Sequence, residues 1–157
     1  MLKQSTLIFL LLVAVAASAQ SSYGQSHQPV ANIRGEWRWA IYAKSRAELP
    51  PAYRNENLKD VPQAEIDLTL KQKGDKLAGE YSASQRFLAR LEDGEFDTNI
   101  KGNSAQFELT SGFGGTVTVL LRLQGNRLHW KTIKSEGESY FPDDVYLTRV
   151  VRRKKRR

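Results

Sequence analysis

A period-two alternation of apolar and polar residues runs from Gly35 to Arg149, interrupted by tight turns. Strict alternation is typical of a β-strand that has one face in the core and the other in water. The pattern repeats about eight times and leaves little room for helix, so it predicts an all-β domain. The expected strands are residues 35–43, 64–71, 76–84, 95–101, 104–110, 116–124, 127–133 and 144–149.

Three connections between these strands are only two residues long, namely Gly74-Asp75, Gly102-Asn103 and Gly125-Asn126. Glycine followed by Asx suits a type II′ hairpin, because glycine adopts the first conformation at little cost. The repeated turn predicts sequential antiparallel neighbours. Two connections are long: residues 44–63 are rich in proline, and residues 85–93 suit either a helical turn stopped at Gly94 or a short ninth strand.

Eight antiparallel strands must hide one apolar face, either by closing into a barrel or by forming two stacked sheets. We expect a single antiparallel eight-stranded up-and-down barrel, because a meander brings the last strand back beside the first and leaves no open edge. The inward positions are then uncharged and mostly bulky. They are Trp37, Trp39, Ile66, Leu68, Leu70, Tyr81, Phe96, Phe107, Val119, Leu121, Trp130 and Leu147.

The two ends of the chain differ from this domain. Residues 1–19 have the pattern of a secretory signal peptide: Lys3, an apolar run over residues 7–17, and small residues before Gln20. That run is too short for a membrane span, which needs about 20 residues, and no other long apolar stretch follows. The chain has no cysteine and no Asn-x-Ser/Thr site. We therefore expect a bacterial periplasmic or secreted protein with a linker at 20–31, a barrel domain at 32–151 and a basic tail at 152–157.

The formal charge of +7 comes almost entirely from this tail, because the rest of the chain after residue 19 is balanced between basic and acidic residues. We therefore expect no specific nucleic-acid site on the barrel. The tail is either a solubilising end or a segment that adheres to an anionic envelope surface. Its residues are Arg152, Arg153, Lys154, Lys155, Arg156 and Arg157.

The layout resembles the calycin barrels, the superfamily of lipocalins, fatty-acid-binding proteins and avidins. Such barrels carry Gly-x-Trp on the first strand and a basic residue of the last strand over that tryptophan. Gly35-x-Trp37 matches the first element and Arg149 is placed to match the second. The resemblance implies that Trp37 and Arg149 close the barrel together, and that residues 44–63 form a lid over its open end.

Catalytic chemistry is not expected. The two histidines are His27, in the linker, and His129, on the solvent-facing side of its expected strand. Neither has a second histidine at the spacing of metal ligands. The glycine-rich run 111–115 lacks the Lys-Ser/Thr of a phosphate loop, and Asp143-Asp144 resembles a turn. The sequence therefore predicts no enzyme, no metal site and no cofactor.

Two functions remain. The interior could be packed solid, or it could hold a small hydrophobic molecule in a pocket lined by Trp39, Tyr81 and Trp130, with Tyr53 reaching in from residues 44–63. The first case favours a protein-binding scaffold or an enzyme inhibitor that acts through its loops. The second favours an exported carrier.

Overall fold

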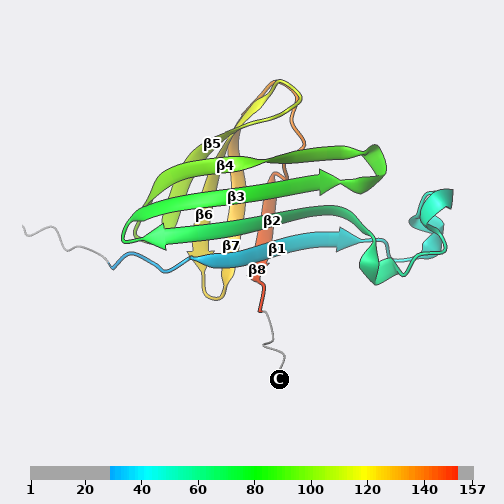
Figure 1. The fold of residues 1–157 in the computed structure, drawn as a ribbon, viewed down its shortest axis with the longest axis horizontal. Helices are drawn as coiled ribbons and strands as arrows, with labels where there is room; N and C mark the ends of the chain where they lie inside the picture. The colour runs from blue at the N-terminus through cyan, green and yellow to red at the C-terminus, as the bar shows by residue number, and fades with distance from the viewer. Residues whose placement is uncertain (1–28, 152–157) are drawn as a thin grey trace, which may run out of the picture.

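The computed structural model describes residues 29–151. All eight strands pair antiparallel with their sequence neighbours, and β8 returns to β1, so the chain forms a closed up-and-down barrel (Figure 1). This confirms the predicted fold class. The strands are β1 Gly35–Tyr42, β2 Pro62–Lys73, β3 Lys76–Gln85, β4 Arg90–Lys101, β5 Ser104–Thr110, β6 Thr116–Gln124, β7 Arg127–Glu136 and β8 Asp144–Arg149.

The three two-residue hairpins have the predicted geometry. Gly74, Gly102 and Gly125 have φ of 64°, 61° and 60°. Among residues 29–151 the only non-glycine residue with positive φ is Ala89, so the Asx residue of each turn has negative φ. A positive φ at the first position alone defines type II′, whose twist matches that of the flanking strands. Local chemistry therefore determines the order of the meander.

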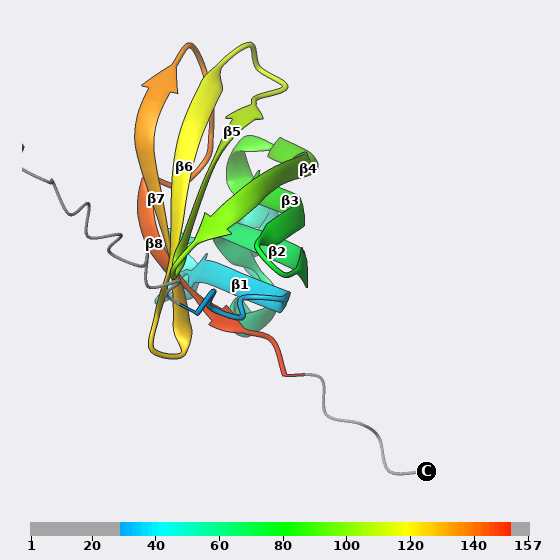
Figure 2. The same cartoon turned by 90° about the vertical axis from the view of Figure 1, so that its left-hand side faces the viewer.

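The barrel consists of two four-stranded sheets that meet along two short seams. At one seam β4 pairs with β5 only through Ile100–Ala105 and Lys101–Ser104. At the other, β1 pairs with β8 only through Trp37–Arg149 and Arg38–Thr148. Strands β1–β4 cross the direction of β5–β8 in both views (Figures 1 and 2). Beyond these pairs the Val150 N–H donates to the carbonyl of Glu36 at 2.8 Å, and side chains of the core make the other contacts between the two sheets.

The core between the sheets contains the inward residues expected from the alternation. Except for Trp39, which is half-buried, every inward position predicted above is buried. The most enclosed side chains include Trp37 at 1% exposure and Trp130 at 0%. Burial of one face of every strand removes a large apolar area from water, which is the main stabilising contribution to such a fold.

Both long connections form 3₁₀ turns. Residues 44–61 contain η1 Arg46–Glu48, η2 Pro51–Tyr53 and η3 Leu58–Asp60, and they project past the ends of β1 and β2 (Figure 1). Residues 85–93 form η4 Arg86–Leu88, and Ala89 in the left-handed region then directs the chain into β4. The expected helical turn is therefore present, but it ends at Ala89 rather than at Gly94, and residues 90–93 belong to β4 rather than to a ninth strand. Within residues 29–151 no helix is long and apolar enough to cross a bilayer.

Candidate functional site

The floor of the barrel is closed by Trp37 and Arg149, the pair that the resemblance implied. They lie opposite each other in the β1–β8 register, and the guanidinium carbon is 4.3 Å from the centroid of the indole. The indole Nε1 donates to the carbonyl of Ile33 at 2.8 Å, and Arg149 donates to the carbonyl of Arg34. The pair therefore satisfies free carbonyls of the incoming chain while it covers the core.

Two of the four predicted pocket residues, Tyr81 and Trp130, are buried in the main core. Both lie against Phe141, with ring centroids 5.5 and 6.1 Å away. The Trp130 Nε1 donates to the carbonyl of Pro142 at 2.9 Å, which satisfies its only polar group. Sequence reasoning missed Phe141, although a Phe-Pro pair within a polar connection is a signal for an anchored loop.

Further aromatic rings continue this cluster across the β4–β5 seam. Phe96 stacks on Phe107 with centroids 3.6 Å apart and planes 6° from parallel, and Phe107 meets Trp130 edge-on at 6.2 Å. Phe96 also lies directly over Gly79 of the neighbouring strand. The rings occupy the region in which the sequence placed a pocket, so side chains fill this part of the interior. We name Tyr81, Phe96, Phe107, Trp130 and Phe141 the aromatic cluster.

The other two predicted pocket residues lie elsewhere. Trp39 is half-buried and packs at the edge of the main core. Tyr53 contacts Phe87 of η4, with centroids 5.3 Å apart, in a separate small cluster with Ala43, Leu49 and Val61. The connection at 44–61 therefore packs on itself and on η4, and it does not bring Tyr53 to Tyr81 or Trp130.

A buried carboxylate joins the two sheets at the end far from Trp37. Glu92 of β4 is 3% exposed. It accepts hydrogen bonds from Ser111 Oγ at 2.6 Å, from the Gly112 N–H at 3.0 Å and from the Tyr140 N–H at 3.1 Å. Three donors from two loops compensate the cost of burying the charge. Glu92 therefore fastens the β5–β6 and β7–β8 loops to β4 where no strand pairing does so.

Glu92 has an electrostatic effect on the aromatic cluster. Burial, together with the nearby carboxylates of Glu92 and Asp93, raises the pKa of the Tyr81 phenol above its ordinary value of 10.0. The phenol therefore stays neutral throughout the physiological range. Sequence reasoning missed Glu92 because residues 85–93 were not assigned to a strand. In β4 the even-numbered side chains point inward, and extending this alternation back from Phe96 would have placed the Glu92 carboxylate in the core.

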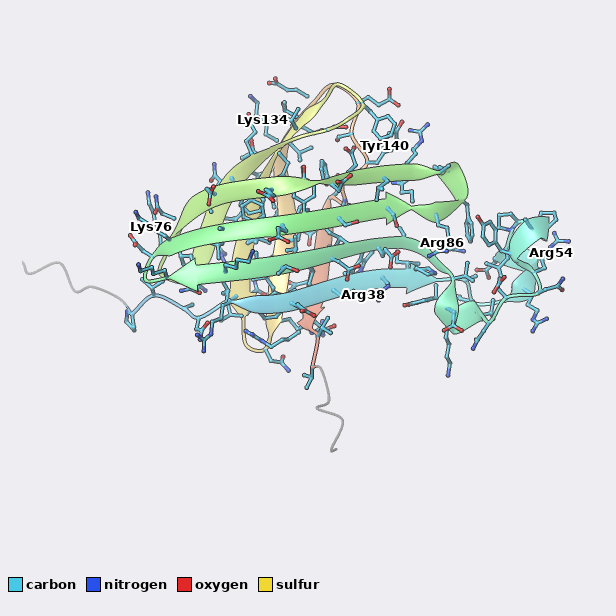
Figure 3. All side chains as sticks on the ribbon, in the orientation of Figure 1. Arg38, Arg54, Lys76, Arg86, Lys134 and Tyr140 are labelled. Atoms are coloured by element: carbon cyan, nitrogen blue, oxygen red, sulfur yellow. The ribbon has the colours of Figure 1, made fainter. Side chains whose placement is uncertain are left out.

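A cluster of aromatic and cationic side chains lies on the outer surface, next to the loops that Glu92 holds. The Arg90 guanidinium stacks 3.7 Å from the Tyr140 ring and contacts Glu138 at 3.3 Å. Phe113 meets Tyr140 edge-on at 4.8 Å and is 42% exposed. Figure 3 shows Tyr140 at this end of the molecule, far from Lys76 at the β2–β3 hairpin. We name Arg90, Phe113, Glu138 and Tyr140 the loop cluster.

The glycine-rich run 111–115 is held in place by several hydrogen bonds. Ser111 is 4% exposed, its Oγ accepts the Phe113 N–H at 3.0 Å, and its N–H donates to the carbonyl of Gly115 at 2.8 Å. These bonds, with the two to Glu92, fix the position from which Phe113 projects.

His129 lies on the outer face, as predicted. Its Nε2 contacts Asp144 Oδ1 at 2.6 Å and its ring stacks on Tyr146 at 4.5 Å. Residues 29–151 contain no group of three His, Cys, Asp or Glu side chains able to hold a metal ion. His27, the predicted signal peptide and the basic tail lie outside the described residues.

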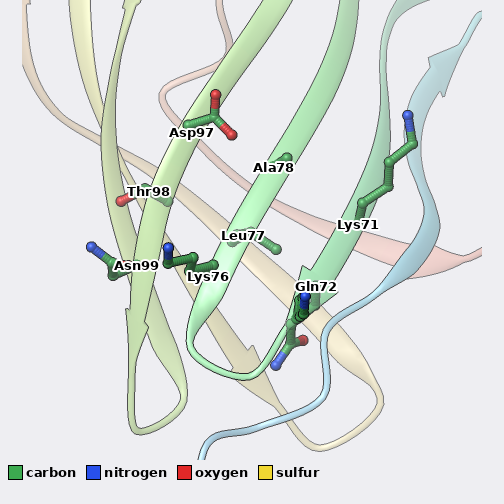
Figure 4. Close-up of a pocket in the computed structure, with 9 residues that line it drawn as sticks. Lys71, Gln72, Lys76, Leu77, Ala78, Asp97, Thr98 and Asn99 are labelled. Carbon is green, nitrogen blue, oxygen red and sulfur yellow. The ribbon is translucent and has the colours of Figure 1, made fainter.

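Several clefts open on the outside of the barrel. One of about 460 Å³ lies over the β2–β3 hairpin and β4, between Lys71, Lys76 and Asp97 (Figure 4). A second, of about 420 Å³, lies where β4 and β5 separate, beside Thr98 and Gln106. Thr98 closes part of that separation by donating its hydroxyl to the carbonyl of Gln106 at 2.7 Å. Neither cleft contains a residue of the predicted pocket.

Comparison of the chain with protein-family models, with curated proteins and with solved structures yielded no match. The barrel is therefore established by the structure alone, and the resemblance to calycins stays a prediction.

Proposed function

We propose that this chain is an exported binding module that recognises another protein through the loop cluster at one end of a packed barrel. The observation that carries the proposal is the Arg90–Tyr140–Phe113 arrangement, in which an exposed aromatic ring and Tyr140 lie on loops held by Glu92 and the guanidinium of Arg90, at the start of β4, stacks on Tyr140. Tyr and Arg are enriched among the residues that dominate protein interfaces. Fixing them before binding reduces the entropy lost on association.

The packing of the interior supports this choice over carriage of a ligand. The aromatic cluster occupies the centre of the barrel, and its members are at most 8% exposed. A small barrel that is filled by its own side chains is a rigid support for loops. The predicted signal peptide supports a partner in the periplasm or outside the cell.

Site-specific photocrosslinking in the native host tests the proposal. A benzoylphenylalanine residue replaces Phe113 in one variant and Asn126, at the opposite end of β6, in a control variant. The proposal predicts a discrete protein adduct at position 113 that disappears when Arg90→Ala is added, and no adduct at 126. Equal adducts at both positions, or none at 113, would contradict it.

A second candidate, carriage of a small hydrophobic molecule, is favoured by one feature of the β1–β8 seam. Strand β1 continues past its last pairing with β8, and there Trp39 is half-buried and Ile41 is 47% exposed. These two side chains lie on the same face of β1 as Trp37 and form an apolar edge where the two sheets separate. Titration with fatty acids, retinoids and haem tests this function. Quenching that is lost in Trp39→Phe supports it, and absence of quenching at micromolar ligand contradicts it.

A further inference from the structure

Strand β4 has one backbone edge that is unpaired over most of its length. Its other edge pairs with β3 at every position from residue 90 to residue 99, whereas its register with β5 contains only Ile100–Ala105 and Lys101–Ser104. Figure 2 shows β4 and β5 diverging from that shared end. The cleft of about 420 Å³ beside Thr98 and Gln106 opens where this separation begins. An unpaired strand edge presents backbone donors and acceptors that can pair with another extended chain.

The hydrogen-bond alternation identifies the β4 residues that present these backbone groups. The Ile100 N–H donates to the carbonyl of Asp75 at 2.7 Å, so the even-numbered residues of β4 direct their N–H and C=O groups toward β3. The odd-numbered residues direct theirs toward the side of β5. In the described chain the odd-numbered residues without a register partner on β5 are Leu91, Asp93, Glu95 and Asp97. We name residues 91–97 the β4 edge.

The β4 edge carries acidic side chains on its outer face. Asp93, Glu95 and Asp97 are all exposed. Within residues 29–151 none of the three makes an ion pair. Because side chains alternate along a strand, the three carboxylates lie on the same face at successive outward positions. We name Asp93, Glu95 and Asp97 the acidic row.

No basic side chain lies directly opposite the acidic row. Its cross-strand neighbours on β3 are Ser82, Glu80 and Ala78. Lys71 of β2 contacts Glu80 at 2.6 Å, and Lys76 lies opposite Asn99, beyond the end of the row. Cross-strand pairs of opposite charge stabilise a sheet, and pairs of like charge destabilise it. A strand that paired with the open side of β4 could therefore supply the cations that β3 does not.

The inner face of the β4 edge is uncharged beyond Glu92. Gly94, Phe96 and Thr98 alternate with the acidic row, and Phe96 is only 7% exposed. The side chains of an added strand would also alternate between the two faces. Those on the outer face would lie beside the acidic row, and those on the inner face beside Gly94 and Phe96. The β4 edge therefore matches a segment in which basic residues alternate with apolar ones.

We propose that the β4 edge binds an extended segment of another protein, in which basic and apolar residues alternate, and that this segment becomes a fifth strand of the β1–β4 sheet. Backbone hydrogen bonds provide the affinity, and the acidic row selects the basic side chains. A second copy of this chain is a poor occupant, because pairing two β4 edges would bring two acidic rows together. This surface is separate from the loop cluster, and the proposal does not depend on that cluster.

Fluorescence anisotropy with a labelled, end-capped peptide tests the proposal. The peptide is Val-Lys-Val-Lys-Val-Lys-Val, and it is titrated with the chain from residue 20 onward in about 0.1 M salt. Two further peptides carry N-methyl groups either on the three lysines or on three of the valines, so their composition and charge are identical. In a paired strand only one of these alternate sets directs its N–H groups toward the neighbour.

The proposal predicts that one methylated peptide loses affinity at least about tenfold, while the other stays within about threefold of the unmodified peptide. Equal affinities of the two methylated peptides would show that charge alone attracts them. Failure of the unmodified peptide to bind at millimolar protein would show that the edge accepts no such strand. Either result overturns the proposal.

A triple variant of the acidic row tests the place of binding. Asp93→Asn/Glu95→Gln/Asp97→Asn should weaken binding of the unmodified peptide about tenfold, because three cross-strand charge pairs are lost. The matched control, Glu56→Gln/Asp60→Asn/Asp75→Asn, removes the same charge from other exposed residues and should weaken it less than about threefold.

Circular dichroism and thermal unfolding establish that each variant is folded. Equal losses in the two triple variants would show that only net charge matters, and this result overturns the proposal. Dimerisation of the wild-type chain through the β4 edge, detected by sedimentation and altered only in the acidic-row variant, would identify a second copy as the occupant and overturn it as well.

Discussion

The guanidinium carbon of Arg149 lies 4.3 Å from the centroid of the Trp37 ring, although the two residues belong to the last and the first strand. This contact coincides with one of only two residue pairs that join β8 to β1. Closure of the barrel therefore depends on side-chain stacking as well as on backbone pairing.

A double-mutant cycle on this pair tests that dependence. Trp37→Leu is expected to lower the free energy of unfolding by about 2–4 kcal/mol, since it truncates a buried side chain. Arg149→Ala is expected to lower it by about 1–2 kcal/mol. The coupling energy from urea unfolding should be at least about 0.5 kcal/mol, because either single substitution already removes the stacking contact between the two side chains. Additive effects would show that the contact does not stabilise the closure.

Glu92 is predicted to hold the far end of the two sheets together. Glu92→Ala removes the acceptor of three hydrogen bonds and leaves their donors unsatisfied, so it should lower the free energy of unfolding by about 2–4 kcal/mol. Ser111→Ala removes one of the three bonds and should cost about 1 kcal/mol. Urea unfolding measures both. If Glu92→Ala lowers the free energy of unfolding by less than about 0.5 kcal/mol, the range of ordinary surface substitutions, Glu92 does not hold the two sheets together.

Gly79 is predicted to tolerate no larger residue. A Cβ at this position would overlap the ring of Phe96. Gly79→Ala should therefore cost about 1–3 kcal/mol, as overpacking of a core usually does. Gly112→Ala is the matched control, because a Cβ there meets no atom within 4 Å. Phe96→Leu in the Gly79→Ala background should recover part of the loss. Equal stability of the two glycine variants would show that the Phe96 ring is displaced freely.

The raised pKa of Tyr81 predicts a loss of stability in alkali. The folded state binds the phenolic proton more tightly than the unfolded state. The contribution is therefore complete below the ordinary pKa of 10.0 and is lost as the pH rises through the folded pKa. Unfolding free energies of wild type and Tyr81→Phe, measured across this range, should diverge least below pH 9 and most above pH 10. Parallel pH profiles would contradict the assignment.

Much of the fold could be predicted from local signals. The hairpins at Gly74, Gly102 and Gly125 were recognisable because a two-residue Gly-Asx turn acts within four residues of chain. The Trp37–Arg149 contact was accessible only through the resemblance, together with the expectation that terminal strands meet.

Other features depend on contacts between distant residues. The short seams follow from strand twist and stagger, which no local pattern encodes. Glu92 is buried because loops of the opposite sheet donate hydrogen bonds to it, and Phe141 is buried because its own loop packs it against Tyr81 and Trp130. Tyr53 was placed in a pocket on the analogy of a lid, whereas proline-rich turns direct it onto Phe87.

The most direct test of a scaffold with a filled interior is equilibrium binding of the fluorescent apolar probe 1-anilinonaphthalene-8-sulfonate to the native protein. Phe107→Ala, measured with benzene, serves as the positive control, because removing one ring of the aromatic cluster leaves an apolar cavity for a molecule of about that size. We predict no saturable binding of either probe to the wild type and saturable binding of benzene to Phe107→Ala. Saturable one-to-one binding to the wild type, with transfer of excitation from its tryptophans, would contradict the account and favour a carrier.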